Sequence, residues 1–160
     1  MNKFNNISTI VSYFEVDCMG IVHNSVYLQW LEKARMNFSS KIIGFSRELF
    51  KINKVDVIVK NVFIDYLSPA KLGLDVQISS FCIINKNGSF DFEYIITSGD
   101  NHKKLARAKT THYFVSDENK LLIRIPNSIK NIINAAIANH SDFFYFNEQK
   151  MQINDFCVVV

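Results

Sequence analysis

The chain has 160 residues, of which 48% are hydrophobic and 21% charged, with a formal net charge of +3. This composition is too apolar for a disordered protein, and its apolar runs are shorter than the roughly 18 residues of a membrane-spanning helix. Lysine and arginine are scattered among acidic residues, which disfavours nucleic-acid binding. Cys18, Cys82 and Cys157 are too far apart to indicate a disulfide framework or a zinc site. We expect one soluble domain in a reducing cytoplasm, with no signal peptide and no membrane span.

The N-terminal part of the chain predicts a strand and then a long helix. Residues 7–14 alternate roughly between apolar and polar side chains, as a half-buried strand does. From Ser25 onward, apolar residues recur every three or four positions, at Tyr27, Leu31, Ala34, Phe38 and Ile42. Asn24 or Ser25 can cap the start of this helix, and Gly44 can take the positive φ that follows a helix end. The helix should span about five turns, or near 27 Å.

The second half of the chain predicts mainly strands. Alternating apolar residues mark the segments 55–59, 62–66, 74–78, 90–96, 105–115 and 121–125. The later turns are too short for crossover helices, so we expect neighbouring strands to pair antiparallel as a meander. Pro126 then precedes a second helix with apolar residues from Ile129 to Ile137 on one face.

These elements predict an α+β fold. The long amphipathic helix needs an apolar surface, and the sheet is the only large one available. We expect a long central helix wrapped by a curved antiparallel sheet of five to six strands, plus a C-terminal helix and tail. Residues 1–140 should form a single domain, and the apolar tail 141–160 should pack on the body or on a partner subunit.

Residues 13–35 are the most informative about function. Asp17 and Gly20 precede the expected helix start, where unpaired N–H groups and the positive end of the helix dipole favour negative charge on a carbonyl oxygen. Gly20 lets the backbone approach a ligand closely. A carboxylate held opposite, such as Asp17, can act as a general base on water or attack an acyl carbon itself. Many helices begin after Asp and Gly for capping reasons alone, so the residues by themselves leave both interpretations open.

In this segment the sequence resembles the 4-hydroxybenzoyl-CoA thioesterase family of hotdog-fold acyl-CoA thioesterases. The matching residues are Asp17, Gly20, Val22, Tyr27, Glu32 and Arg35. Residues 65–70 resemble that family's Tyr-x-x-Pro-Ala strand end, and the likeness covers roughly residues 7–138. The resemblance implies a hotdog fold and hydrolysis of an acyl thioester, with no metal or other cofactor. It also implies a homo-oligomer, a dimer or tetramer, with active sites between subunits.

The resemblance further implies roles for individual residues. Asp17 matches the family's nucleophile or general base, and the backbone N–H of Asn24 matches its oxyanion donor. Tyr27 is expected to line the acyl pocket, or simply to pack in the core. Many relatives have Tyr-His where this chain has His23-Asn24, so the role of that histidine is not carried over. His23 is therefore a candidate only for substrate contact, as is Gly20.

A small basic cluster at a predicted turn is a further candidate for substrate binding. It consists of His102, Lys103, Lys104 and Arg107. Phosphates of coenzyme A can dock on Lys103 and Lys104, although a solvated turn explains the cluster equally simply. An acyl-carrier-protein substrate and a non-catalytic acyl-binding module stay open as alternatives to an acyl-CoA thioesterase. A hotdog dehydratase would need a histidine and acid arrangement that this motif does not show.

Three other features receive weaker interpretations. Cys18 adjoins Asp17, but neighbouring residues of an extended segment point opposite ways, so the two should not share a pocket. Glu32 and Arg35 lie three residues apart on a helix and should form a surface or interface ion pair. His112 and His140 have no partner pattern and are given no role.

Overall fold

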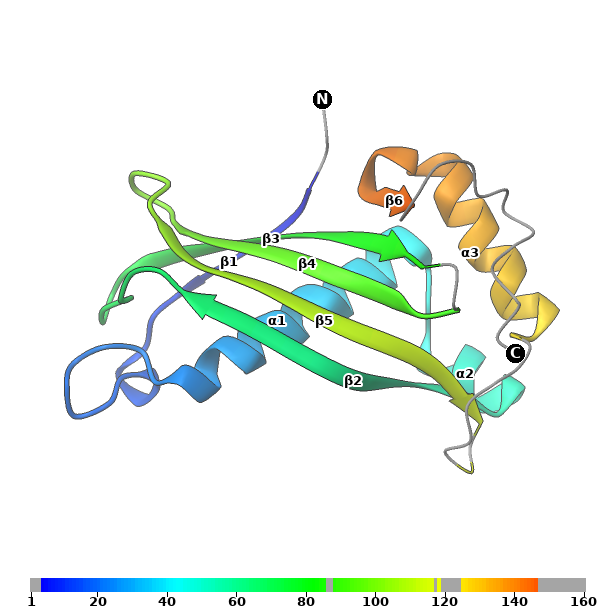
Figure 1. Ribbon diagram of the computed structural model, residues 1–160, viewed down its shortest axis with the longest axis horizontal. Helices are drawn as coiled ribbons and strands as arrows, with labels where there is room; N and C mark the ends of the chain where they lie inside the picture. Colours follow the sequence, from blue (N-terminus) through cyan, green and yellow to red (C-terminus); the bar gives the residue numbers. More distant parts are fainter. Residues whose placement is uncertain (1–3, 86–87, 117, 119–124, 147–160) are drawn as a thin grey trace.

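The computed structural model describes residues 4–85, 88–116, 118 and 125–146 (Figure 1). The strands are β1 (Asn5–Ile10), β2 (Val55–Tyr66), β3 (Asp75–Ile84), β4 (Phe90–Ser98), β5 (Lys104–Ser116) and β6 (Phe144–Phe146). The α-helices are α1 (Asn24–Phe38), α2 (Arg47–Asn53) and α3 (Asn127–Asn139), with short helical turns at Tyr13–Glu15, Ser39–Ile43 and Ser141–Phe143. No helix within these residues is long and apolar enough to cross a membrane.

The strands form one sheet in the order β1-β3-β4-β5-β2, and β6 runs parallel to the end of β3. The β3-β4-β5 meander is antiparallel, as predicted. β2 pairs with β5 rather than with β3, the strand that follows it in the chain. The reason is that β1 and β4 occupy the two hydrogen-bonding edges of β3. β2 is consequently an edge strand.

The sheet curves around α1, which lies along its concave face (Figure 1). The buried side of α1 follows the predicted period and consists of Val26, Tyr27, Trp30, Leu31, Ala34 and Phe38. Alternate residues of β4 face it, and the ring centroids of Phe38 and Phe92 are 5.2 Å apart. The predicted α+β architecture, a long helix wrapped by a curved sheet, is therefore confirmed.

The ends of α1 show how local residues set its length. The N-cap is His23, not Asn24 or Ser25 as predicted, because its imidazole Nδ1 accepts the hydrogen bond that a Ser or Asn oxygen usually takes. The C-terminal end continues through a π-helical turn, Ser39–Ile43, to Gly44. Gly44 has a φ of 85°, the left-handed conformation predicted for it.

Two features of the fold were not expected from the sequence. The short helix α2 was missed, and it is capped by Ser46, whose hydroxyl accepts from the N–H of Leu49. The segments 55–59 and 62–66 form the single strand β2, interrupted between Val59 and Asn61 by an irregularity in its pairing with β5. The strand expected at 121–125 lies, apart from Ile125, outside the described residues.

The C-terminal segment packs on the body as far as it is described. α3 buries Ile129, Ile133, Ala136 and Ile137, four residues of the predicted apolar face. β6 then pairs with β3, and the ring centroids of Phe144 and Phe38 are 5.7 Å apart. Residues 147–160 of the expected tail lie outside the described residues.

Candidate functional site

A hollow of about 570 Å³ lies where α1 begins. It is lined by Asp17, Ile21, Val22, His23, Asn24, Tyr27, Tyr66, Leu67, Ser68 and Pro69. Four of the predicted site residues, Asp17, His23, Asn24 and Tyr27, thus come together, joined by the end of β2. A larger hollow, about 1030 Å³, lies beside α2 but is lined by none of the predicted site residues.

The loop that carries Asp17 is fastened to the core through Glu15. The Glu15 carboxylate accepts from the Trp30 Nε1–H at 3.1 Å and from the Ser12 N–H at 2.7 Å. The backbone carbonyl of Glu15 accepts from the N–H of His23 at 2.9 Å. Partial burial alone would raise the pKa of Glu15, but hydrogen bonds from Ser12 and Trp30 lower it below the usual value. The ionised Glu15 carboxylate therefore ties the start of the loop to α1, and the Glu15 backbone carbonyl ties it to the N-cap residue His23.

Asp17 opens a tight turn that Gly20 closes. The N–H of Gly20 donates to the Asp17 carbonyl at 3.0 Å, and Gly20 takes a φ of 73°, which favours glycine. The Oδ1 of Asp17 accepts from the N–H of Met19 at 2.8 Å. One carboxylate oxygen is thus held by the turn, and no described residue is bonded to the other. Gly20 does not line the hollow itself; it shapes the turn that holds Asp17.

The start of α1 supplies a backbone donor. His23 caps Ser25 and Val26, since its Nδ1 accepts from the N–H of Ser25 at 3.2 Å and its backbone carbonyl from the N–H of Val26 at 3.0 Å. No acceptor among the described residues is bonded to the N–H of Asn24. This N–H lies at the positive end of the helix dipole. The hollow therefore joins a carboxylate to a site that favours an oxyanion.

Two tyrosines form one wall of this hollow. Tyr27 is 3% exposed, and its ring centroid lies 5.0 Å from that of Tyr66 and 4.9 Å from that of Trp30. The Tyr66 hydroxyl donates to the Asn24 carbonyl at 3.4 Å. Burial raises the pKa of Tyr27, so its hydroxyl stays protonated at neutral pH. Tyr27 packs in the core and also lines the hollow.

The structure does not bring the other candidates into the hollow. Lys103, in the β4-β5 turn, and Lys104, the first residue of β5, are exposed at the end of the sheet where α1 begins (Figure 1). They precede Leu105, whose carbonyl accepts from the N–H groups of Leu67 and Ser68. Cys18 is exposed and, unlike Asp17, does not line the hollow. Within the described ranges, no group of three His, Cys, Asp or Glu side chains is placed to hold a metal ion.

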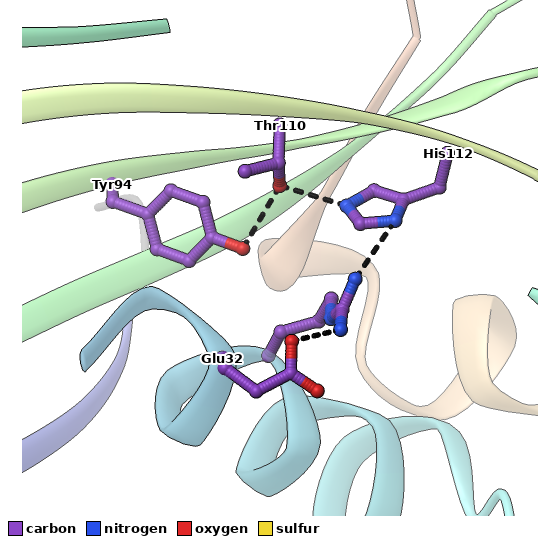
Figure 2. Close-up of polar contacts among 5 residues, drawn as sticks. Glu32, Tyr94, Thr110 and His112 are labelled. Carbon is purple, nitrogen blue, oxygen red and sulfur yellow. Dashed lines mark hydrogen bonds and ion pairs between the residues drawn. The ribbon is translucent and has the colours of Figure 1, made fainter. Parts of the chain in front are cut away.

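A second hollow, of about 240 Å³, lies farther along α1. It is lined by Leu28, Leu31, Glu32, Arg35, Val59, Val62, Tyr94 and Thr110. Figure 2 shows a chain of hydrogen bonds beside it: Arg35 Nη1 to His112 Nδ1 at 3.0 Å, His112 Nε2 to Thr110 Oγ1 at 2.7 Å, and Thr110 Oγ1 to the Tyr94 hydroxyl at 3.0 Å. Arg35 forms the expected ion pair with Glu32, but its side chain is only 15% exposed.

His112 lies at the centre of this series of hydrogen bonds, and the sequence had given it no role. It is fully buried, and burial and the charge of Arg35 lower its pKa to about 3, against opposing effects of Asp91 and the Ile58 backbone. The imidazole is therefore neutral at physiological pH. A usable signal was present in β5, because Thr110 and His112 are successive polar residues at the alternate positions that face the core.

Comparisons with known proteins identify the family and the fold. Residues 11–133 match the family model of the thioesterase-like superfamily. An Aquifex aeolicus protein named "Putative esterase" is 29% identical over 132 residues, covering 77% of this chain and 92% of its own. The 1,4-dihydroxy-2-naphthoyl-CoA thioesterase of Synechocystis has a TM-score of 0.72 at 20% identity, covering 82% of this chain and 96% of its own. A Staphylococcus aureus protein in complex with CoA has a TM-score of 0.76 at 11% identity, covering 100% of this chain and 97% of its own. The chain belongs to the thioesterase-like superfamily and has the hotdog fold.

Proposed function

We propose that the protein is an acyl-CoA thioesterase, which hydrolyses the thioester bond to a free acid and CoA in the cytoplasm. The observation that carries this proposal is the shared hollow of Asp17 and the first turn of α1. A carboxylate beside an unpaired helix N–H is suited to acyl transfer, because one group activates the nucleophile and the other stabilises the oxyanion. Membership of the superfamily and the neighbour that holds CoA give further support.

In this mechanism the thioester carbonyl lies at the start of α1, and its oxygen accepts from the N–H of Asn24. Asp17 then acts in one of two ways. As a general base it takes a proton from water while the water oxygen bonds to the carbonyl carbon, and the C–S bond breaks to release the thiolate. As a nucleophile it bonds to that carbon itself, expels the thiolate, and leaves an anhydride that water hydrolyses. Both routes end in the acid and CoA.

We also propose that the enzyme is a homo-oligomer, a dimer or a tetramer, built through β2. This edge strand of 12 residues exposes large apolar side chains, including Ile58 at 40% and Phe63 at 60%. Such an edge is an aggregation hazard unless another strand covers it. Tyr66 ends β2 and lines the Asp17 hollow, so a second copy paired along β2 would border the site. Lys103 and Lys104, at the same end of the sheet, are placed to attract the phosphates of CoA.

The test is release of free thiol from short, long and aromatic acyl-CoA thioesters by wild type and Asp17→Asn. We expect Asp17→Asn, nearly isosteric but unable to act as base or nucleophile, to lose roughly a hundredfold or more of the activity. Glu48→Gln, which removes an exposed carboxylate on α2, is the matched control and should keep full activity.

Other outcomes separate the alternatives. Unchanged turnover by Asp17→Asn would refute the assignment of Asp17. Turnover only with acyl-carrier-protein thioesters would move the proposal to that substrate. Acyl-CoA binding without turnover of any thioester would identify a binding module instead of an enzyme.

A further inference from the structure

The hollow beside Arg35 combines an apolar rim with a polar floor. Leu28, Val59 and Val62 are each between 43% and 47% exposed around it. The hydroxyl-bearing side chains of Tyr94 and Thr110, which are 2% and 5% exposed, line the same space. Buried hydroxyl groups beside an open apolar rim are arranged to orient a ligand that is mostly hydrocarbon.

The two hollows lie along one line, where α1 faces β2. Both elements contribute to each hollow. Asn24 of α1 and Tyr66 of β2 line the first hollow, and Glu32 of α1 and Val62 of β2 line the second. The eight residues from Asn24 to Glu32 rise about 12 Å along the helix. The four residues from Tyr66 back to Val62 span about 13 Å along the strand. The two distances agree, so the second hollow begins within the length of a medium-chain acyl group from the helix start.

The hydrogen-bond chain beside the second hollow has a fixed direction. The guanidinium of Arg35 can only donate, so the Nδ1 of His112 accepts from it and the neutral ring carries its hydrogen on Nε2. That hydrogen is donated to the Thr110 hydroxyl oxygen. The Thr110 and Tyr94 hydroxyls share one hydrogen bond but have two hydrogens between them. One hydroxyl hydrogen is therefore not used within the chain, and both side chains that can carry it line the hollow.

Glu32 determines which oxygen-containing group of a ligand fits beside the Tyr94 and Thr110 hydroxyls. Glu32 is one of the residues that line the hollow, and its carboxylate pairs with Arg35. A hydroxyl group on a ligand can accept from the Tyr94 or Thr110 hydroxyl and donate to a carboxylate oxygen at the same time. A carboxylate on a ligand has no hydrogen to donate, and the charge of Arg35 that could attract it is already paired with Glu32. The site thus matches a neutral hydroxyl.

We propose that the hollow beside Arg35 binds the far end of the acyl group and selects acyl thioesters with a hydroxyl there, with Tyr94 and Thr110 as specificity-determining residues. This inference rests on the proposed function, because it takes the thioester carbonyl to lie beside Asp17. The volume of about 240 Å³ is below the roughly 300 Å³ at which pockets for drug-sized ligands begin, which favours a slender acyl end over a bulky one.

The test compares matched straight-chain acyl-CoA thioesters of six to twelve carbons, with and without a terminal hydroxyl. Two readouts are used: kcat/KM from thiol release by the protein with Asp17 intact, and Kd from calorimetry on Asp17→Asn. We expect a preference for the hydroxylated member at the length that fits. The double variant Tyr94→Phe with Thr110→Val, which removes both hydroxyls, should reduce that preference roughly two- to tenfold, the worth of one hydrogen bond. Thr110→Ser, which keeps the hydroxyl, should keep the preference. Ser80→Ala is the matched control, because it removes a buried hydroxyl that is bonded to Asn5 instead.

The outcomes separate this inference from the proposed function. Equal values for the two members in both readouts, or no binding of any hydroxylated thioester, would overturn the inference. A double variant that weakens both members equally, or that keeps the preference, would show that the two hydroxyls do not select the ligand and would also overturn it. A lower Kd for the hydroxylated member without turnover of any thioester would support the inference and refute the proposed thioesterase activity. If that double variant does not fold, Tyr94→Phe with Thr110→Ala also removes both hydroxyls and should reduce the preference in the same way.

Discussion

The buried imidazole of His112 should make the stability of the fold depend on pH. Its pKa is about 3 in the folded protein, against 6.5 for an exposed histidine. Above pH 6.5 the ring is neutral in both the folded and the unfolded state, so it does not make the free energy of unfolding depend on pH. As the pH falls from 6.5 to 3, the unfolded chain takes up a proton that the folded chain does not, so the free energy of unfolding decreases. At about 1.36 kcal/mol per pH unit, the decrease totals about 5 kcal/mol, which is a large part of a typical domain's stability.

Urea unfolding of wild type and His112→Gln between pH 4 and pH 7 measures this effect. The amide of glutamine can accept from Arg35 and donate to Thr110, but it does not titrate. Asp91 and Glu15, whose pKa values are lowered, also reduce stability in acid, but they do so in both proteins and cancel in the difference. We expect the advantage of wild type over the variant to shrink by about 1 kcal/mol per pH unit between pH 6 and pH 4. A difference that stays constant with pH would refute the reasoning, because it would mean that His112 titrates alike in both states.

Three further predictions follow from packing, backbone conformation and the sheet edge. Phe38→Ala empties a site that is 0% exposed and should lower the free energy of unfolding by about 3 to 5 kcal/mol in urea; a loss below 1 kcal/mol would contradict the packing around α1. Gly20→Ala puts a residue with a Cβ at a positive φ and should lower the free energy of unfolding by about 1 to 2 kcal/mol in the same assay. Unchanged stability would show that the turn does not require a glycine at this position. Phe63→Lys places a charge on the exposed edge of β2 and should give a monomeric mass in light scattering, while Ile52→Lys, on α2, should keep the oligomer. An unchanged mass in Phe63→Lys would place the interface elsewhere.

Local patterns predicted the parts of the fold that neighbouring residues determine. The three-to-four spacing of apolar residues gave the buried face of α1, and Gly44 marked its end because few other residues adopt a positive φ. α2 was missed because seven residues are too few for a clear period. The pairing of β2 with β5 could not be predicted, since it depends on which edges the other strands already occupy.

The candidate site also has a part that local sequence predicts and a part that depends on the tertiary fold. Asp17, Asn24 and Tyr27 lie within eleven residues, so a loop and one helical turn are enough to bring them together. Tyr66 joins them only because the sheet returns to the start of α1, and the resemblance of residues 65–70 to a strand end gave it no role in the site. The contact of Arg35 with His112 spans 77 residues, and no local pattern in either segment indicates it.

The hydrogen bond between Trp30 and Glu15 gives the protein an internal optical probe. Trp30 is the single tryptophan of the chain, and its indole N–H is bonded to the carboxylate that holds the loop before α1. Indole emission responds to the polarity and hydrogen bonding around the ring, so movement of this loop away from the helix should shift the fluorescence of the whole protein. Occupation of the neighbouring hollow can then be followed by intrinsic fluorescence, without a label and without waiting for turnover.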